Sequence, residues 1–268
     1  MAETANDARN ERGKRLIAVC GKGGTGKTAT IAMMTRALLE NTSTGRLLLI
    51  DADPAMGLLS ALGVKVRRTM GEVREDIIRT SRRGKSEEKA QIADTLDYML
   101  LEALTELPDF SVLAMGRTET LGCFCPVNTL LRGAIETLAD SFDTILIDGE
   151  AGLEQLNRQI VRTLHSLLII SDPTSRGMQT AGMIKEMVAV DKVIRCEKLG
   201  LIFNRVRGNE ELLYGCAEKL GLELAGLITF DENVAEYDLI GKPITELPSD
   251  ASSLEAVRKV VENYVLTE

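Results

Sequence analysis

The feature that most constrains this chain is a glycine-rich segment, residues 21–28, with the sequence GKGGTGKT. The apolar run Leu16–Cys20 precedes it, and the helical pattern Lys27–Leu39 begins inside it. The spacing G-x-x-x-x-G-K-[ST] between a strand and a helix is typical of loops that wrap nucleotide phosphates. Glycines let backbone N–H groups turn toward phosphate oxygens, and the start of a helix adds a partial positive charge. The segment therefore predicts a phosphate-binding loop.

Short apolar runs alternate with helical patterns along the rest of the chain. None of these runs alternates apolar with polar residues, so we expect strands that are buried on both faces, as in parallel sheets. The expected strands are Leu16–Cys20, Leu47–Ile50, Ser111–Ala114, Thr144–Ile147, Leu167–Ile170, Leu201–Phe203 and Leu224–Ile228. The expected helices are Lys27–Leu39, Asn128–Ala139, Leu153–Leu164, Gly177–Val190 and Glu210–Leu220. This order predicts a single-domain α/β fold of the P-loop NTPase kind, with a doubly wound, mainly parallel sheet flanked by helices.

Three segments fall outside this alternation. Residues 1–14 have no apolar stretch, and we expect a disordered tail before a domain that spans 15–268. Residues 64–109 are rich in charge and have no strand pattern, which predicts a helical insertion with helices at Met70–Thr80 and Glu87–Leu104. Residues 253–266 have an apolar stripe but balanced charge, so we expect this helix to pack on the core rather than on a membrane.

Composition narrows the range of partners and compartments. Lysine and arginine number 32 against 40 aspartates and glutamates, which leaves a net charge of −8. This charge disfavours binding to nucleic acid or to an anionic membrane, and with 3% aromatic residues and no tryptophan the chain has little to stack on bases. The five cysteines are an odd number spread along the chain, which suits a reducing cytoplasm. We therefore expect a cytoplasmic protein that binds neither nucleic acid nor membrane.

The phosphate-binding loop assigns roles to individual side chains. Lys27 is expected to reach the β- and γ-phosphates, and the Thr28 hydroxyl to bind Mg²⁺. Asp148 follows an apolar strand and is expected to be the Walker B carboxylate, which holds Mg²⁺ directly or through a water ligand of the ion. Asp53 is expected to orient or polarise the attacking water. The expected nucleotide contacts of the loop are Gly21, Lys22, Gly23, Gly24, Thr25, Gly26, Lys27, Thr28 and Ala29.

A pair of cysteines, Cys123 and Cys125, lies between an expected strand and an expected helix. In extended backbone, residues i and i+2 point the same way, so both sulfur atoms can face one ion. Two thiolates leave a soft metal half coordinated, and the single histidine, His165, is expected to be a core residue. A symmetric dimer would supply four sulfur atoms. Such a site suits Zn²⁺, a 4Fe-4S cluster, or Ni²⁺ in a flatter geometry.

The segment Lys22–Thr28 resembles the deviant Walker A motif of the superfamily that includes MinD, ParA and the nitrogenase iron protein. The resemblance implies a homodimer that forms face to face around ATP, in which Lys22 reaches the partner's phosphates. It also implies that Asp53 and residues 148–152 are nucleotide-sensing switches. Asn204 and Arg205 are then expected near the adenine base.

Further motifs resemble the CooC-type ATPases, accessory proteins of nickel carbon monoxide dehydrogenase maturation. These motifs are Met115-Gly116-Arg117, Gly122-Cys123-Phe124-Cys125, Asn128 with Leu130-Leu131-Arg132, Asp148–Glu154, Ser171-Asp172-Pro173 and Gly241-Lys242-Pro243. The resemblance implies an ATPase that carries nickel on Cys123 and Cys125 and loads it into an apo-metalloenzyme. The segments 119–122 and 155–159 depart from the family pattern, which leaves open another client, such as acetyl-CoA synthase. An iron–sulfur ATPase and a MinD-like positioning ATPase remain alternatives.

Overall fold

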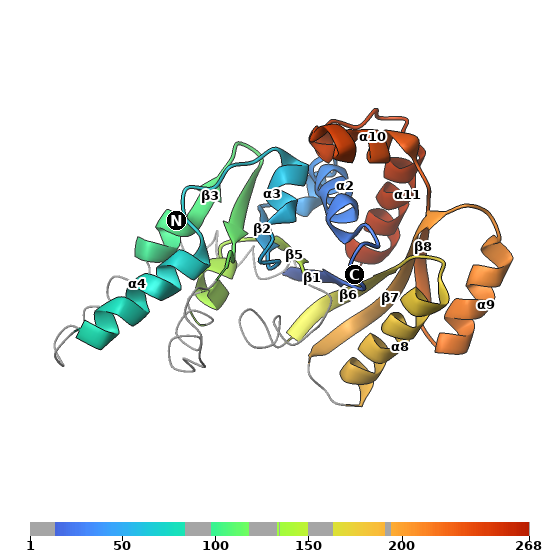
Figure 1. The fold of residues 1–268 in the computed structure, drawn as a ribbon, viewed down its shortest axis with the longest axis horizontal. Helices are drawn as coiled ribbons and strands as arrows, with labels where there is room; N and C mark the ends of the chain where they lie inside the picture. The colour runs from blue at the N-terminus through green and yellow to red at the C-terminus, as the bar shows by residue number, and fades with distance from the viewer. Residues whose placement is uncertain are drawn as a thin grey trace, which may run out of the picture.

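The computed structural model describes residues 14–83, 98–117, 133, 135–149, 163–190 and 194–267. The strands are β1 (Arg15–Cys20), β2 (Leu47–Asp51), β3 (Leu104–Glu106), β4 (Phe110–Ala114), β5 (Thr144–Asp148), β6 (Thr163–Ser171), β7 (Arg195–Val206) and β8 (Glu223–Thr229). They form one sheet in the order β3-β4-β2-β5-β1-β6-β7-β8 (Figure 1). All neighbours are parallel except β3 and β4. The predicted single-domain α/β fold with a mainly parallel sheet is confirmed.

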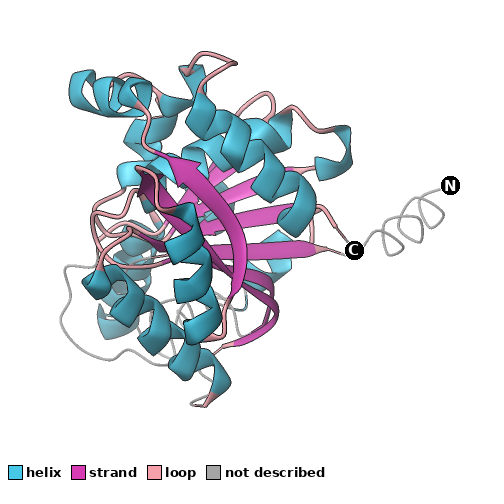
Figure 2. Cartoon of the chain, turned by 90° about the vertical axis from the view of Figure 1, so that its right-hand side faces the viewer, coloured by secondary structure: helices cyan, strands magenta, loops and turns pink. Residues whose placement is uncertain are grey.

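Helices cover both faces of this sheet (Figure 2). They are α2 (Lys27–Leu39), α3 (Gly57–Leu62), α4 (Met70–Arg83), α8 (Ser175–Ala189), α9 (Glu210–Leu220), α10 (Glu232–Ile240) and α11 (Ser252–Val260), with short turns at η1 (Thr42–Thr44), η2 (Ile244–Glu246) and the π-helical η3 (Val261–Val265). The central strand β1 sends Ile17 and Val19 into the core under α2, α3 and α11. Its alternate residues Ala18 and Cys20 pack into the core shared with α4, α8 and α9. Burial on both faces explains why the strands have no polar alternation.

The predicted all-helical insertion at 64–109 is wrong at its end. Residues 98–103 are helical, but Leu104–Glu106 form β3 instead of continuing the helix to Leu104. This strand pairs antiparallel with β4 through a tight turn, in which the Leu107 N–H donates to the Phe110 carbonyl at 2.9 Å. A three-residue edge strand is too short to produce a period in the sequence. The predicted first helix is present as α4, and residues 84–97 lie outside the described residues.

The predicted helix Leu153–Leu164 is also wrong at its end, because β6 already begins at Thr163. His165 therefore lies in a strand rather than at a helix end. Its Nδ1 is 3.0 Å from the Ser166 hydroxyl, its side chain is 17% exposed, and burial lowers its pKa. Lys14 belongs to the tail that was expected to be disordered, but its ammonium lies 2.8 Å from Asp140 Oδ1.

The C-terminal apolar stripe packs on the core, as predicted. Leu254 and Val257 of α11 are fully buried in the same cluster as α2, and the helix contacts α2 and β8. Among the described residues, no helix combines the length and the apolar character that crossing a membrane requires.

Candidate functional site

The glycine-rich loop leaves β1 through a close crossing. Gly21 has φ +143°, and a Cβ atom there would lie 2.1 Å from the Ile170 carbonyl oxygen of β6. Gly26 caps α2 with φ +86°, a left-handed conformation that side chains disfavour. The glycines at these two positions are therefore required by the path of the chain between β1 and α2.

The two lysines of the loop have different environments. Lys27 is 9% exposed, and its ammonium donates to the Lys22 carbonyl at 3.3 Å. The Thr25 hydroxyl donates to the same carbonyl at 2.9 Å. The Lys22 side chain is 37% exposed, and its Nζ lies 3.9 Å from Asp172 Oδ2. Lys27 thus lies within the loop, whereas the Lys22 side chain extends along its rim.

Two buried carboxyl groups lie beside the start of α2. The Thr28 hydroxyl donates to Asp148 Oδ2 at 3.1 Å, and Asp51 is the register neighbour of Asp148 on the adjacent strand. Burial raises the pKa of Asp51 to about 6 and the pKa of Asp148 to about 7. Within the described part of the chain, Asp51 Oδ2 and Asp148 Oδ1 have no hydrogen-bond partner.

This arrangement fits a divalent cation. Buried carboxylate oxygens without partners are costly unless a cation or a proton satisfies them, and Mg²⁺ prefers oxygen ligands. Thr28 and Asp148 are the side chains that would hold the ion beside the nucleotide phosphates. Asp51 is a candidate that sequence reasoning missed. The signal was present in Asp51-Ala52-Asp53, but we assigned a role only to the second carboxylate.

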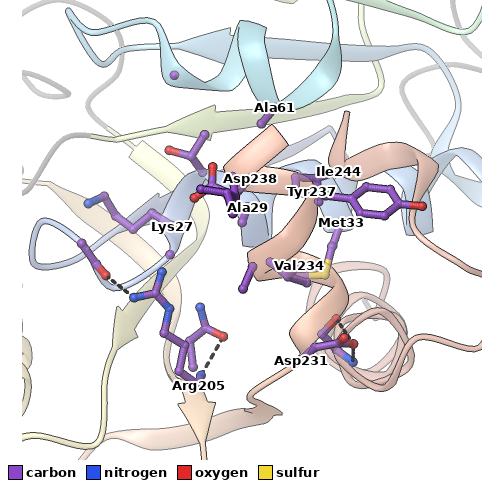
Figure 3. A pocket seen from close by; sticks show the side chains of 18 of the residues that line it. Lys27, Ala29, Met33, Ala61, Arg205, Asp231, Val234, Tyr237, Asp238 and Ile244 are labelled. Carbon is purple, nitrogen blue, oxygen red and sulfur yellow. Dashed lines mark hydrogen bonds between the residues drawn. The ribbon is translucent and has the colours of Figure 1, made fainter. Parts of the chain in front are cut away.

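The end of β7 contacts the outer side of the loop. Asn204 Nδ2 donates to the Thr25 carbonyl at 2.8 Å. Arg205, labelled in Figure 3, donates from Nη1 to the Gly24 carbonyl at 3.0 Å. Asn204 is 6% exposed, and Arg205 has a left-handed φ of 59°. Both residues lie inside the longer observed strand, rather than after it.

A cavity of about 860 Å³ extends from the loop to α10. At its phosphate end it is lined by Gly23, Gly24, Gly26, Lys27, Thr28, Ala29, Asp53, Asn204 and Arg205. At its helix end it is lined by residues such as Met33, Ala61, Val234, Tyr237 and Ile244, which surround the opening in Figure 3. The structure thus brings most of the expected nucleotide contacts to one cavity. Gly21, Lys22, Thr25 and Asp148 support that end without lining the cavity.

The expected metal-binding cysteines, Cys123 and Cys125, lie outside the described residues, as does most of the expected switch 148–152. Within the described ranges, no group of three or more His, Cys, Asp or Glu side chains could hold a metal ion. Cys20, the last residue of the expected buried strand Leu16–Cys20, is fully buried, and burial raises the pKa of its thiol to about 12.

The fold, the loop and the strand-end carboxyl groups define a P-loop nucleotide-binding protein. The family model "CobQ/CobB/MinD/ParA nucleotide binding domain" matches residues 16–244. The chain belongs to this family.

Relatives with curated descriptions cover almost the whole chain. An uncharacterized ATP-binding protein of Methanocaldococcus jannaschii is 36% identical over 93% of this chain and 98% of its own length. The carbon monoxide dehydrogenase accessory protein CooC of Rhodospirillum rubrum is 30% identical over 84% of this chain and 87% of its own length. Among solved structures, MinD of Pyrococcus horikoshii complexed with Mg-ADP aligns with a TM-score of 0.66 at 22% identity, covering 93% of this chain and 95% of that one. This last likeness concerns the fold.

Proposed function

We propose that this chain is an ATP-hydrolysing nickel metallochaperone of the cytoplasm. It dimerises around ATP and assists nickel insertion into an apo-metalloenzyme such as carbon monoxide dehydrogenase. The proposal is supported by the 30% identity to CooC together with the Cys123-Phe124-Cys125 pair in a P-loop protein. The uncharacterized ATP-binding relative supports ATP as the nucleotide.

The observation that supports hydrolysis is the contact between Thr28 and Asp148 beside the buried Lys27. Mg²⁺ held by Thr28 and Asp148 would neutralise charge on the phosphates. Lys27 would stabilise the negative charge that develops on the β- and γ-phosphates. Asp53, which lines the cavity, would orient the water that attacks the γ-phosphorus. As the water oxygen bonds to the γ-phosphorus, the bond from that phosphorus to the β,γ-bridging oxygen would break, which releases ADP and phosphate; one proton of the water stays on the phosphate and the other passes to solvent.

Dimerisation would couple this reaction to the cargo. The Lys22 side chain is partly exposed and lies 3.9 Å from Asp172 Oδ2, and in the proposed dimer it would contact the phosphates bound by the partner. Closing of the dimer would bring four sulfur atoms together, two from each subunit, around one nickel ion. Hydrolysis would then reopen the dimer and weaken the hold on the ion.

The experiment is anaerobic metal analysis of the protein with and without ATP. We expect about one nickel ion per dimer, lost in the Cys123→Ser/Cys125→Ser variant because two serine hydroxyls do not replace thiolates. The Cys216→Ser variant is the matched control, since Cys216 lies on α9 and should leave the nickel content unchanged. Nickel that persists in the double variant contradicts the proposal.

A second candidate is a positioning ATPase like MinD, a protein that the matching family model names. Co-sedimentation of the ATP-loaded protein with anionic liposomes or DNA would support it over nickel delivery. A third candidate is an iron–sulfur ATPase that resembles the nitrogenase iron protein. A brown anaerobic preparation with cluster absorbance would favour that function, and zinc at the same sulfur atoms would appear in the metal analysis.

A further inference from the structure

We propose that Met56 is a positioning residue for ATP hydrolysis, because its strained backbone fixes the turn that holds Asp53 at the cavity. The assignment rests on the proposed ATPase activity, and it does not depend on nickel. Met56 lies in the turn between β2 and α3, and no expectation from the sequence concerned it.

The backbone of Met56 has an unusual conformation. Its φ is 53°, in the left-handed region that side chains rarely adopt. A residue in this region persists there only where the surrounding structure holds it, and such residues cluster at functional sites. Among the described residues, the other non-glycine residues with positive φ are Arg205 and Asn209, and asparagine tolerates this conformation better than methionine does. Met56 therefore requires a contact that compensates for its backbone.

The Met56 side chain supplies this contact. It is partly buried and packs against the core that lies under α2, α3 and α11. Glycine at this position would adopt the same backbone without strain, but it would have no side chain to hold the turn against the core. The methionine thus fixes the turn, although its own backbone is strained.

The turn that Met56 closes determines the position of Asp53. The Met56 N–H donates to the Asp53 carbonyl at 2.9 Å, and the Ala55 N–H donates to Asp53 Oδ1 at 2.8 Å. The Asp53 N–H donates to Asp51 Oδ1 at 3.1 Å. The peptide groups on both sides of Asp53 and one of its carboxylate oxygens are therefore held, and Oδ2 is the oxygen that would meet the attacking water.

The same turn places two residues on the wall of the cavity. Asp53 and Gly57, which come before and after Met56 in the chain, both line it. A Cβ atom on Gly57 would lie 3.8 Å from the Thr28 hydroxyl oxygen, so the start of α3 lies close to the side chain that is expected to bind Mg²⁺. Helix α3 also packs beside α2 (Figure 1). A change in the conformation of residue 56 would therefore move Asp53 relative to the bound phosphates.

Asn209 provides a matched control. Like Met56, it precedes a helix in a left-handed conformation and makes no side-chain hydrogen bond to the start of that helix. It is not among the described residues that line the cavity. Glycine relieves the backbone at both positions, so a difference between the two glycine variants reports the position of Asp53 rather than backbone strain in general.

The test is ATP hydrolysis, measured as phosphate release over a range of ATP concentrations. We expect Met56→Gly to lower kcat by about tenfold and to change KM by less than about twofold, because ATP still binds but the water is no longer well oriented. Met56→Leu keeps an apolar side chain of similar volume and should retain kcat within about twofold, as should Asn209→Gly. In an Asp53→Asn background, followed under single-turnover conditions, Met56→Gly should cause no further loss, because the two residues act as one unit.

Three results would overturn the assignment to Met56 alone, provided that the parent protein hydrolyses ATP. They are a normal kcat in Met56→Gly, an equal loss in Asn209→Gly, and a further tenfold loss in the Asp53→Asn background. A parent protein that does not hydrolyse ATP would contradict the proposed ATPase activity and the role of Met56 together. Nickel content of the same samples reports the metallochaperone proposal separately.

Discussion

The two ends of the nucleotide cavity are stabilised in different ways. At the phosphate end, side chains of Lys27, Asp51 and Asp148 are buried against the strands, and two carboxylate oxygens lack a partner among the described residues. At the helix end, α10 has no buried side chain, and Leu239 is 85% exposed. The phosphate end is thus built from buried polar side chains, whereas the helix end is lined by a helix whose side chains are all at least partly exposed.

The pKa values of the carboxyl groups at the two ends of the cavity are shifted in opposite directions. Burial raises the pKa of Asp51 and of Asp148, and repulsion from a neighbouring carboxylate, Asp53 for the first and Asp51 for the second, raises it further. Asp231 begins α10; burial raises its pKa, but hydrogen bonds from Ser253 and Asn233 outweigh burial and lower it overall. A lowered pKa marks a carboxylate that the fold already satisfies, and a raised pKa marks one that a bound ion can satisfy.

The largest effect is expected at the phosphate end. Lys27→Ala should weaken ATP binding by about 100-fold or more, because the variant loses a buried ammonium that is expected to contact the phosphates. Lys22→Ala should bind ATP nearly normally and hydrolyse it poorly, if Lys22 acts on the partner's phosphates. Calorimetry and phosphate release measure the two steps. Equal loss of binding in both variants would show that the lysines share one role.

The next effect concerns pH. Because the folded pKa values of Asp51 and Asp148 lie above the unfolded value, the folded state binds more protons between about pH 4 and 7. Stability of the Mg²⁺-free protein should therefore fall as the pH rises through this range. Asp51→Asn should be more stable than the parent by about 2 kcal/mol at pH 8, with little difference near pH 4. Urea unfolding in EDTA measures this, and parallel pH profiles would contradict it.

The smallest effect is expected at the helix end. Asp231→Ala removes the side chain that caps α10 and accepts from Ser253 of α11, which should lower stability by about 1–2 kcal/mol. Leu239→Ser on the same helix is the control, and it should change stability by less than about 0.5 kcal/mol because Leu239 is exposed. Thermal unfolding measures both. Equal losses would show that α10 is packed more firmly than its exposure indicates.

The features that could be predicted most accurately from the sequence are the regular helices and buried strands and the glycine-rich loop. The loop 21–28, the helices Lys27–Leu39 and Glu210–Leu220, and the central strands were predicted because buried strands and glycine spacing leave clear patterns. Prediction failed where the signal is tertiary. The edge strand β3 forms because it pairs with β4. Helix α10 has no buried face, so its sequence has no helical period of apolar residues.

The sequence indicates which residues belong to the site better than it indicates which of them contact one another. Lys27 and Thr28 follow from spacing alone, since the motif fixes their positions relative to the start of the helix. The pairing of Asp51 with Asp148 depends on β2 lying beside β5, a neighbour relation between strands almost 100 positions apart in the chain. The contact of Arg205 with Gly24 likewise depends on the irregular register of β7 against β8. No pattern in the neighbouring sequence predicts this irregularity.

The crossing at Gly21 makes the site sensitive to a single methyl group. A side chain there would push against the Ile170 carbonyl, one residue before the end of β6. The displaced strand leads directly into Asp172, whose carboxylate lies near Lys22. One added carbon at this crossing would therefore disturb the shape of the loop and the environment of its outer lysine together, although it touches neither ligand nor charge.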